Sequence, residues 1–564
     1  MINLDEDQLL FYDIEVFKHN AFVVIKNINK ETVAVFHNDF NGIWEVIKDK
    51  TLVGFNNHWY DDKIITAMIN CHTPEQLKHL NDRVIKGERV KTDMRLKTLD
   101  VFQQISVSKP GLKKIEGNMG KMILETSVGF DIDRPLTEEE YQAELKYCKY
   151  DVDMTIEIWK LRQDSYFKPK KALLERYGNL RAVNWNTTTI SANMLLDKPM
   201  AQWSSLRVDE DILNLVPLEV KDMWLQVNDI GATLKTKTKT INEFGNKLVF
   251  GFGGLHATKS NGKRFENVIL CDIVSYYPSM IINLGVLGPA TELYKSILEE
   301  RVRIKKTEPI IQEALKLVLN SVYGQLNSEY SMLFNTRALY SICVYGQAVI
   351  YELSKRLAMS SEVIQINTDG VMFTSENEMY KDICETWEKE FNLNLEFENI
   401  DLLIQRDVNN YIAVQGDNIT CKGGDVGRYN YNKYFDNNNT RIIDIAIVDH
   451  LVHGKDVLDT ILENLDKPIL FQYILQAGRT YEGTFDKEGK QYNRVNRIFA
   501  SKESNPDKVE LLKKRADGGI HKFANAPSNM LVWNDDVDEL EGFDKIVDIN
   551  WYYQLINKKL EAWL

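Results

Sequence analysis

The stretch CDIVSYYPSM, residues 271–280, places an aspartate directly before a pair of tyrosines and a proline. The apolar run at 268–270 leads into it, which predicts a buried strand that carries Asp272 at its end and then turns into Pro278. A carboxylate in such a position is costly to bury unless it is paired or holds a metal ion. Aspartate is also a common turn residue, so Asp272 alone leaves a turn cap and a metal ligand both open.

Composition predicts a globular protein with several domains. Of its 564 residues, 44% are hydrophobic and 10% aromatic, and this length corresponds to about three to five packed units. No apolar run approaches the roughly 18 residues of a membrane-spanning helix. The start, MINLDEDQLLFYD, lacks the basic segment of a signal peptide. The six scattered cysteines form no CxxC pair, which favours a reducing compartment, free thiols and no zinc site.

The distribution of charge gives one candidate surface for nucleic acid. The net charge of −13 argues weakly against such a partner, but charge can be concentrated locally. Between Gln476 and Phe523, Lys and Arg outnumber Asp and Glu. This stretch is either a phosphate-facing surface or simply a solvated charged face.

Two acids stand close together near the start of the chain. LLFYDIEVF, residues 9–17, predicts a strand, and its period of two places Asp13 and Glu15 on one face. Two further strand-like runs at 19–27 and 31–39 indicate a meander. Like charges side by side on a buried strand repel each other, so a bridging divalent cation would explain the pair.

Two later segments add acids to this set. Residues 51–69 predict a strand, a turn at Asn56 and Asn57, and a helix with Asp61 in its first turn. A capping box predicts that another helix begins at 137 and runs to about 161, where Tyr147 and Asp151 share a face. Four carboxylates of this kind hold the two cations of phosphoryl hydrolysis. They are Asp13, Glu15, Asp61 and Asp151.

In this order, the motifs resemble the 3′–5′ exonuclease domain of family B DNA polymerases, of the type with four acids and a tyrosine. The resemblance implies that the four acids are catalytic and bind metal, and that Tyr147 orients the attacking water. It also implies that Asn57, or alternatively Asn56, contacts the DNA end. Leu112 in GLKKI, residues 111–115, is similar to a family residue that binds the single-stranded 3′ end.

The stretch at 271–280 resembles motif A of the same family, DxxSLYPS, with Tyr276 in place of the leucine. The resemblance implies that Asp272 and Ile273 hold metal and that Ser275 contacts substrate. It implies that Tyr277 excludes ribonucleotides by packing beneath the incoming sugar.

Two helical segments follow motif A and predict a short fingers hairpin. They span 291–306 and 310–324, and Gly324 is predicted as the residue that ends the second. The second segment resembles family motif B, KxxxNSxYG. This implies that Lys316 holds the triphosphate and that Asn320 and Tyr323 contact the nascent pair. Arg301 and Lys305 are expected to face the same phosphates, with a solvated helix face as the alternative.

VIQINTDGVMF, residues 363–373, predicts a strand, a turn and a second strand. NTDG alone is typical of a turn, but it falls where family motif C, YxDTDS, is expected. Thr368 and Asp369 match, whereas Asn367 replaces the first aspartate, Gln365 the tyrosine and Gly370 the serine. The resemblance implies that Asp369 pairs with Asp272 at the metals. Tyr411 and Lys422 are expected to contact the primer terminus.

The remaining segments are less specific. TLKTKTKTINEF, residues 233–244, alternates Thr and Lys, which predicts an exposed strand. Its lysines either face a phosphate backbone or protect a soluble edge of the sheet. In the C-terminal region, 442–454 predicts a strand and 457–465 a helix, and the tail 547–564 predicts an amphipathic helix packed on the palm.

The predicted fold class is α/β multidomain: an RNase H-like exonuclease domain followed by a right-hand polymerase. Its parts would be an α+β palm, short helical fingers and a thumb. The predicted ranges are 1–165 for the exonuclease, 166–250 for a connector, 251–290 and 331–430 for the palm, 291–330 for the fingers, and 431–564 for the thumb and C-terminal region.

The predicted function is a compact phage-type DNA polymerase with proofreading. The resemblance implies two Mg²⁺ ions per active site, with Mn²⁺ as a substitute. It implies primer-template DNA, deoxynucleoside triphosphates and phage replication proteins as partners, no membrane, a monomer, and the host cytoplasm. Protein-primed members of the family carry long insertions between motifs A and B and between motifs B and C. The matching intervals here, from Ser279 to Lys316 and on to Asp369, are short, so the comparison implies neither protein priming nor unaided strand displacement. Three alternatives stay open: a stand-alone exonuclease with a degenerate palm, a primase-polymerase, and a non-catalytic DNA-binding replication factor.

Overall fold

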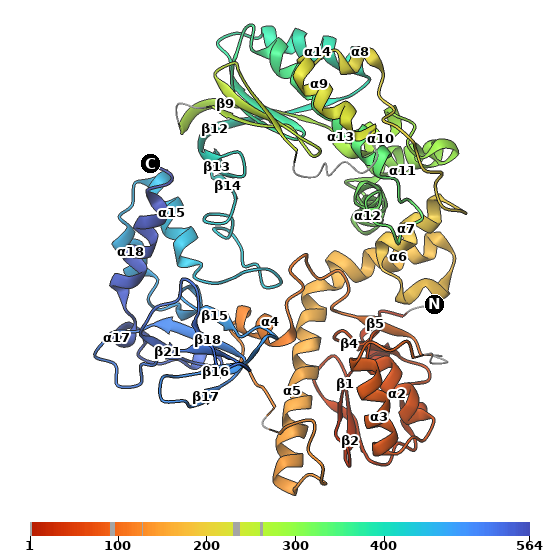
Figure 1. Ribbon diagram of the computed structural model, residues 1–564, viewed down its shortest axis with the longest axis vertical. Helices are drawn as coiled ribbons and strands as arrows, with labels where there is room; N and C mark the ends of the chain where they lie inside the picture. The colour runs from red at the N-terminus through yellow and green to blue at the C-terminus, as the bar shows by residue number, and fades with distance from the viewer. Residues whose placement is uncertain (1–2, 91–95, 127, 229–236, 260–262) are drawn as a thin grey trace. The chain divides into compact units, whose positions relative to one another are not determined.

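The computed structural model describes residues 3–90, 96–126, 128–228, 237–259 and 263–564 (Figure 1). The chain is a mixed α/β protein with several sheets, divided into two compact units. Unit 1 comprises Met1–Asn186, Tyr431–Ile442 and Leu458–Leu555, and unit 2 comprises Thr187–Asn430, Ile443–Val457 and Ile556–Leu564. Of the helices in the described residues, none is both long enough and apolar enough to span a membrane.

Unit 1 contains a five-stranded sheet in the order β3-β2-β1-β4-β5. The predicted meander is confirmed, because β1, β2 and β3 are antiparallel neighbours, and β4 and β5 then add in parallel to β1. These strands are β1 (Leu9–Val16), β2 (Ala21–Lys26), β3 (Thr32–His37), β4 (Thr51–Gly54) and β5 (Thr98–Asp100). Strand β1 is buried along almost its whole length, which makes its two acids exceptional.

Helices pack against β1. They are α2 (Asp61–Ile69), α3 (Pro74–Ile85) and α5 (Glu138–Arg162). The predicted capping box is present at the start of α5, where Thr137 and Glu140 bond reciprocally to each other's backbone N–H groups. The cap fixes where the helix begins, so the position of Tyr147 and Asp151 along it follows from the sequence.

The C-terminal region contributes two small sheets to unit 1, ordered β15-β18-β21 and β17-β16-β19-β20. Their strands are β15 (Tyr473–Gln476), β16 (Tyr481–Phe485), β17 (Gln491–Tyr492), β18 (Val495–Ala500), β19 (Leu512–Arg515), β20 (Ile520–Lys522) and β21 (Met530–Val532). Helix α4 (Leu112–Asn118) packs on β15 and β18. The basic stretch of the sequence therefore folds within the same unit as the first acid cluster.

Unit 2 is built on a nine-stranded sheet in the order β14-β13-β12-β9-β11-β10-β8-β7-β6. Its strands are β6 (Lys239–Glu243), β7 (Asn246–Phe250), β8 (His256–Lys259), β9 (Arg264–Ile273), β10 (Glu362–Asn367), β11 (Gly370–Thr374), β12 (Leu395–Asp407), β13 (Asn410–Gln415) and β14 (Asn418–Lys422). The predicted edge strand is confirmed for β6, whereas residues 233–236 of that prediction lie outside the described residues.

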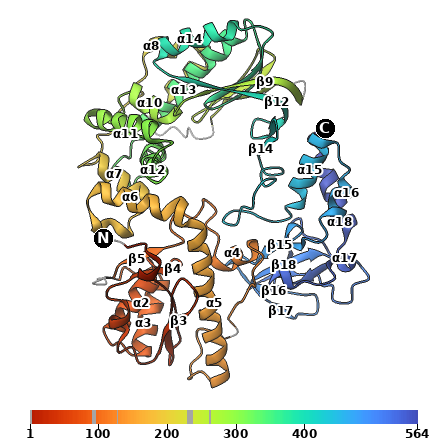
Figure 2. The same ribbon diagram turned by 180° about the vertical axis from the view of Figure 1, so that it is seen from behind.

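Helices complete unit 2. Helix α13 (Thr336–Leu357) packs on β10, β11 and α14 (Met379–Phe391). Helices α13 and α14 are labelled in Figure 1 and, from behind, in Figure 2. The expected hairpin consists of α11 (Thr291–Ile304) and α12 (Pro309–Gln325), which contact each other and α10 (Tyr276–Asn283). Smaller helices flank these, including α7 (Thr187–Leu195), α8 (Glu210–Leu213) and α9 (Leu218–Leu225).

Two local predictions are wrong. Residues 442–454 form helix α15 (Ile442–His453) and not a strand; the run is apolar on nearly every side, and such a run does not distinguish a buried helix from a buried strand. Gly324 does not end the second helix of the hairpin, because α12 continues to Gln325 and Gly324 has no positive φ. The predicted helices at 457–465 and in the tail are confirmed as α16 (Val457–Glu463) and α18 (Ile549–Leu560).

Candidate active sites

The acid cluster of unit 1 is centred on β1. Asp13 and Glu15 lie on one face of the strand, and their ligand atoms are within 4.8 Å of each other and of the thiol of Cys148 on α5. Burial, followed by the charge of Asp151, raises the pKa of Asp13 to about 7. Burial likewise raises the pKa of Asp61 well above its ordinary range, with the charge of Asp13 as the next cause. The four predicted acids are therefore brought together in one buried site.

A cation that the sequence did not point to lies among these acids. Lys113, in the first turn of α4, forms ion pairs with Asp151 and with Glu116, the latter at 3.1 Å. Its ammonium group is 4.5 Å from the ring centre of Tyr147. The neighbouring Leu112 is half-buried at the start of the same helix. Lys113 thus partly neutralises the cluster, and nothing in GLKKI distinguishes it from Lys114.

A cavity of about 1400 Å³ opens beside Glu15. Asn56 lines it, together with Trp59, whose side chain is 73% exposed, and Phe130. Asn57 is fully buried instead, and its amide donates to Asp62 over 2.9 Å. Of the two asparagines that the sequence left open, Asn56 is the one that faces the cavity.

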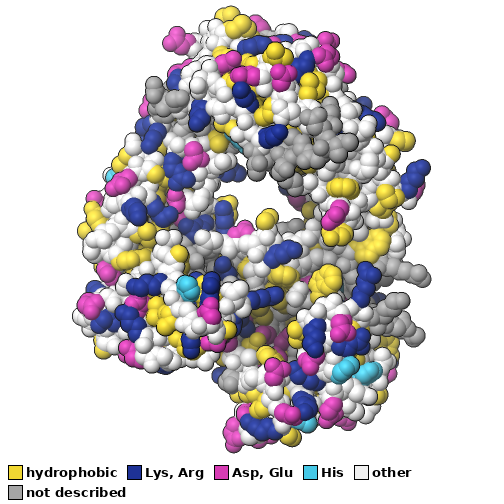
Figure 3. All heavy atoms as spheres, viewed as in Figure 1, with side chains coloured by type: hydrophobic (Ala, Val, Ile, Leu, Met, Phe, Trp, Pro, Cys, Tyr) yellow, Lys and Arg dark blue, Asp and Glu magenta, His cyan; other side chains and the backbone are white. Residues whose placement is uncertain are grey.

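Charged side chains of both signs are interspersed over the face seen in Figure 3. In the β16–β20 sheet, three cations lie over aromatic rings: Lys513 at 4.7 Å from Tyr481, Lys514 at 5.8 Å from Phe485, and Arg515 at 5.6 Å from Tyr481. Arg479, just before β16, also lines the cavity beside Glu15. The basic residues of this segment are thus combined with aromatic surface, as in many surfaces that bind single-stranded nucleic acid.

The second acid cluster lies in the nine-stranded sheet, where β9 runs between β11 and β12. Asp272 is directly opposite Gly370 on β11 and Glu396 on β12. The backbone N–H of Ile273 donates to the carbonyl of Asp369 over 2.8 Å, which holds the two predicted acids on adjacent segments. A Cβ at Gly370 would lie 1.8 Å from a carboxylate oxygen of Asp272. Glycine at this position therefore makes room for the acid.

A cavity of about 80 Å³ lies between Asp272, Asp369 and Tyr411. Burial, followed by the charge of Asp369 and then of Glu398 and Glu396, raises the pKa of Asp272 to about 7. Burial also raises the pKa of Asp369, although the charge of Lys422 opposes it. The two glutamates on β12 are acids that the sequence analysis missed, and alternation in the run LEFEN was the signal that could have indicated them.

The two amides that depart from motif C share one acceptor. The side chains of Gln365 and Asn367 each donate to the carbonyl of Val408 over 3.1 Å. Val408 lies in the turn between β12 and β13. These amides therefore attach the β10–β11 hairpin to the segment that carries Tyr411.

Three tyrosines stand beside this cluster. Tyr277 stacks on Tyr323, and the hydroxyl of Tyr323 is 3.2 Å from the thiol of Cys343 on α13. A Cβ added at Gly346 on α13 would lie only 1.9 Å from the buried hydroxyl oxygen of Tyr276. Helix α13 thus contacts Tyr323 through Cys343 and Tyr276 through Gly346, and no sequence motif indicated these two residues.

The remaining predicted substrate residues lie near the start of α10 and in the helical hairpin. Ser275 precedes α10 in a left-handed conformation, with φ at 52°. Lys316 pairs with Glu313 on its own helix at 3.2 Å, and its side chain is 43% exposed. Arg301 is half-buried on α11, whereas Lys305 and Asn320 are exposed. The basic groups of the hairpin are therefore accessible to an anion.

Both clusters fit divalent cations. Each combines carboxylates whose pKa is raised by burial and like charge even though a lysine lies nearby, so each would gain from a bound cation. Oxygen ligands of this kind suit Mg²⁺ or Mn²⁺. Asp13 and Glu15 would hold an ion in unit 1, and Asp272 and Asp369 in unit 2.

No protein-family model matches the chain and no curated protein does either. Among solved structures, the chain is similar to the family B DNA polymerase from the hyperthermophilic archaeon Pyrobaculum calidifontis, at 12% identity and a TM-score of 0.43. The likeness covers 98% of this chain and 77% of that chain.

Proposed function

We propose that the chain is a DNA-directed DNA polymerase with a 3′–5′ proofreading exonuclease, acting in phage DNA replication. One observation carries the proposal. Asp272 and Asp369, far apart in sequence, lie on adjacent segments at one cavity, while a second, separate acid cluster occupies unit 1. A protein that only bound DNA would gain nothing from two sets of buried acids, because each set costs folding free energy.

In the polymerase site, each residue has a defined task. Bound Mg²⁺ would neutralise phosphate charge and lower the pKa of the primer 3′-hydroxyl. Asp272 and Asp369 would hold the ions. Lys316, which has an accessible ammonium group, would bind the triphosphate and neutralise the departing pyrophosphate. Tyr277, fixed by its stack on Tyr323, would exclude a 2′-hydroxyl by its bulk.

The order of strands in unit 1 supports an RNase H-like nuclease, because an antiparallel meander continues into parallel strands beside the acids. The cavity next to Glu15 supports a single-stranded substrate. Trp59 and Phe130 offer exposed rings for stacking with bases, while Lys63 and Arg479 offer charge for the phosphates. Tyr147 and Lys113 lie at Asp151, where they would orient the attacking water.

The test is primer extension and single-strand hydrolysis by the wild type and by two variants. Asp369→Ala should abolish extension and leave hydrolysis intact, whereas Asp13→Ala should do the reverse. Asp382→Ala removes an exposed acid from α14 and should change neither activity. Wild-type hydrolysis without any extension would refute the polymerase and favour a stand-alone nuclease.

An unprimed circular template extends the same test. Synthesis on it would favour a primase-polymerase, and dependence on a primer would favour the proposal. If no substitution in either acid cluster changed turnover, both catalytic assignments would be wrong and a binding protein would be the better description.

A further inference from the structure

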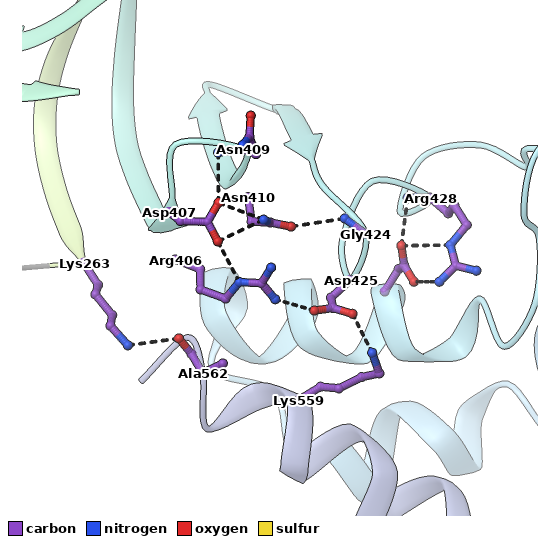
Figure 4. Close-up of polar contacts among 11 residues, drawn as sticks. Lys263, Arg406, Asp407, Asn409, Asn410, Gly424, Asp425, Arg428, Lys559 and Ala562 are labelled. Carbon is purple, nitrogen blue, oxygen red and sulfur yellow. Dashed lines mark hydrogen bonds and ion pairs between the residues drawn. The ribbon is translucent and has the colours of Figure 1, made fainter. Parts of the chain in front are cut away.

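Asp425 ties the C-terminal segment Ile556–Leu564 to the sheet of unit 2 (Figure 4). Asp425, three residues beyond β14, accepts hydrogen bonds from Lys559 at 2.6 Å and from Arg406 at 2.5 Å. Figure 4 shows Asp425 between these two cations, one from the last turn of α18 and one from the end of β12. Burial would raise the pKa of Asp425, but Lys559 and Arg406 together hold it below its ordinary value.

Two further contacts hold the same segment in place. The guanidinium of Arg406 is 5.7 Å from the ring centre of Trp563, which is only 2% exposed. Lys263, just before β9, donates to the carbonyl of Ala562 over 3.0 Å. The end of the chain is therefore docked by ionic, apolar and backbone contacts at once.

Arg406 also contacts the turn between β12 and β13, and so links the C-terminal segment to this turn. Its Nε donates to Asp407 over 3.1 Å. Asp407 also accepts the backbone N–H of Asn409 at 2.9 Å and the side-chain amide of Asn410 at 2.8 Å. On the other side of the turn, the carbonyl of Val408 accepts the amides of Gln365 and Asn367. The turn is thus held both from the C-terminal segment and from the hairpin of Asp369.

The strands after this turn carry the two residues expected at the primer terminus. Tyr411 follows at the start of β13 and lines the cavity of Asp272 and Asp369. Lys422 is directly opposite it on β14, and its charge acts on Asp369. Asp425 lies three residues after Lys422, and Arg406 lies shortly before β13. Both ends of the β13–β14 hairpin therefore adjoin the ion-pair cluster of Arg406, Asp425 and Lys559.

We propose that Lys559 is a positioning residue for the primer terminus: through Asp425 and Arg406, the C-terminal segment fixes the β13–β14 hairpin and so sets Tyr411 and Lys422 against the acid pair. The inference rests on the proposed polymerase function. It predicts that loosening the C-terminal segment weakens primer binding and leaves the nuclease unaffected.

The experiment compares three variants of the full chain. Lys559→Glu places a like charge beside Asp425, and Lys559→Arg keeps the ion pair. Lys558→Glu makes the same charge change on an exposed neighbour in the same helix turn. The measurements are KM for primer–template, kcat of extension, single-strand hydrolysis, and hydrogen exchange of residues 405–424, with β9 as the internal reference for folding.

Lys559→Glu should raise KM for primer–template about tenfold, the size expected for one hydrogen bond to a charged group. It should change kcat little, speed exchange in 405–424 but not in β9, and leave hydrolysis intact. Lys559→Arg should restore KM, and Lys558→Glu should match the wild type. Equal KM and equal exchange in both glutamate variants would overturn the inference. If exchange responds but the wild type extends no primer, the anchoring stands and the polymerase proposal fails.

Discussion

The ring of Tyr277 lies flat against the ring of Tyr323, with ring centres 3.8 Å apart and planes inclined by 21°. The two residues come from different helices, α10 and α12, and the hydroxyl of Tyr323 in turn reaches Cys343 on α13. Each ring restricts the movement of the other. A side chain that excludes a 2′-hydroxyl by its bulk has to keep its position. The stack on Tyr323 gives Tyr277 the rigidity that this proposed role requires.

Tyr277→Ala should therefore raise ribonucleotide incorporation by the polymerase. Tyr323→Ala should raise it too, by up to about tenfold, because an aromatic stack contributes about 0.5–1.5 kcal/mol. The double variant should be less than additive, since each single change already removes the stack. Competition between deoxy- and ribonucleotides in primer extension measures this. Tyr330→Ala, at a residue that is 92% exposed, is the control; unchanged sugar selectivity in Tyr277→Ala would contradict the assignment.

Gly346→Ala should destabilise unit 2 by about 1–3 kcal/mol, because the new methyl group would overlap the hydroxyl of Tyr276. Adding Tyr276→Leu should recover much of the loss by opening space. Gly324→Ala is a matched helical control, since nothing lies within 4 Å of its Cβ, and it should stabilise slightly. Thermal unfolding distinguishes these outcomes, and equal melting temperatures for the two alanine variants would show that the overlap is not real.

Lys113→Ala should slow single-strand hydrolysis by tenfold or more, because it removes a hydrogen bond to a charged group of about 1.5–3 kcal/mol. Without this cation the pKa values of Asp151 and Asp13 should rise further, so the acid limb of the pH–rate profile should move to higher pH. Lys114→Ala tests the adjacent lysine, for which neither effect is expected. Primer extension should be the same in both variants.

The metal-free protein should lose stability as the pH rises towards neutrality. The pKa of Asp272 is about 7 in the folded chain and about 3.8 ordinarily, so the folded state binds more protons between these values. The stabilisation is full below about pH 4 and is lost as the pH rises through 7. From pH 5.5 to 8 the melting temperature should therefore fall further in the wild type than in Asp272→Asn. Mg²⁺ should raise the wild-type value more at pH 8, and identical profiles in the two proteins would contradict this.

The purified enzyme should copy primed single strands but stall at a duplex. Helices α11 and α12 follow each other after a short loop, and the chain passes from α12 through α13 to β10, with little room for inserted elements that open a duplex. Extension across a gap that ends in a downstream strand measures this. Rapid synthesis through that strand by the enzyme alone would refute the expectation.

The sequence was informative where a short motif specified both an element and a chemical role. Asp13 and Glu15 were placed on one strand face by a period of two, and the start of α5 was placed by its capping box. The hairpin of Asp369 followed from its turn residues. In each case the deciding interaction is local, so it can be read without the rest of the fold.

Contacts between distant segments could not be predicted in this way. Lys113 reaches Asp151 only because α4 and α5 pack together, and Cys343 reaches Tyr323 only because α13 lies beside α12. The prediction of a strand for α15 is wrong because its apolar residues are spread around nearly every side of the helix, which removes the helical periodicity. Spacing alone favoured Asn57 over Asn56 as the residue that contacts the DNA end. Asn57 is instead buried, because its amide donates to Asp62.

The shared carbonyl of Val408 has a consequence for how the polymerase site responds to its surroundings. The neutral side-chain amides of Gln365 and Asn367 both donate to this carbonyl. Motif C has a tyrosine and an aspartate at these two positions. An amide does not titrate, and salt screens its hydrogen bonds far less than it screens an ion pair. This edge of the site should therefore keep its shape when pH or ionic strength changes, even as the acids a few ångströms away gain or lose their protons.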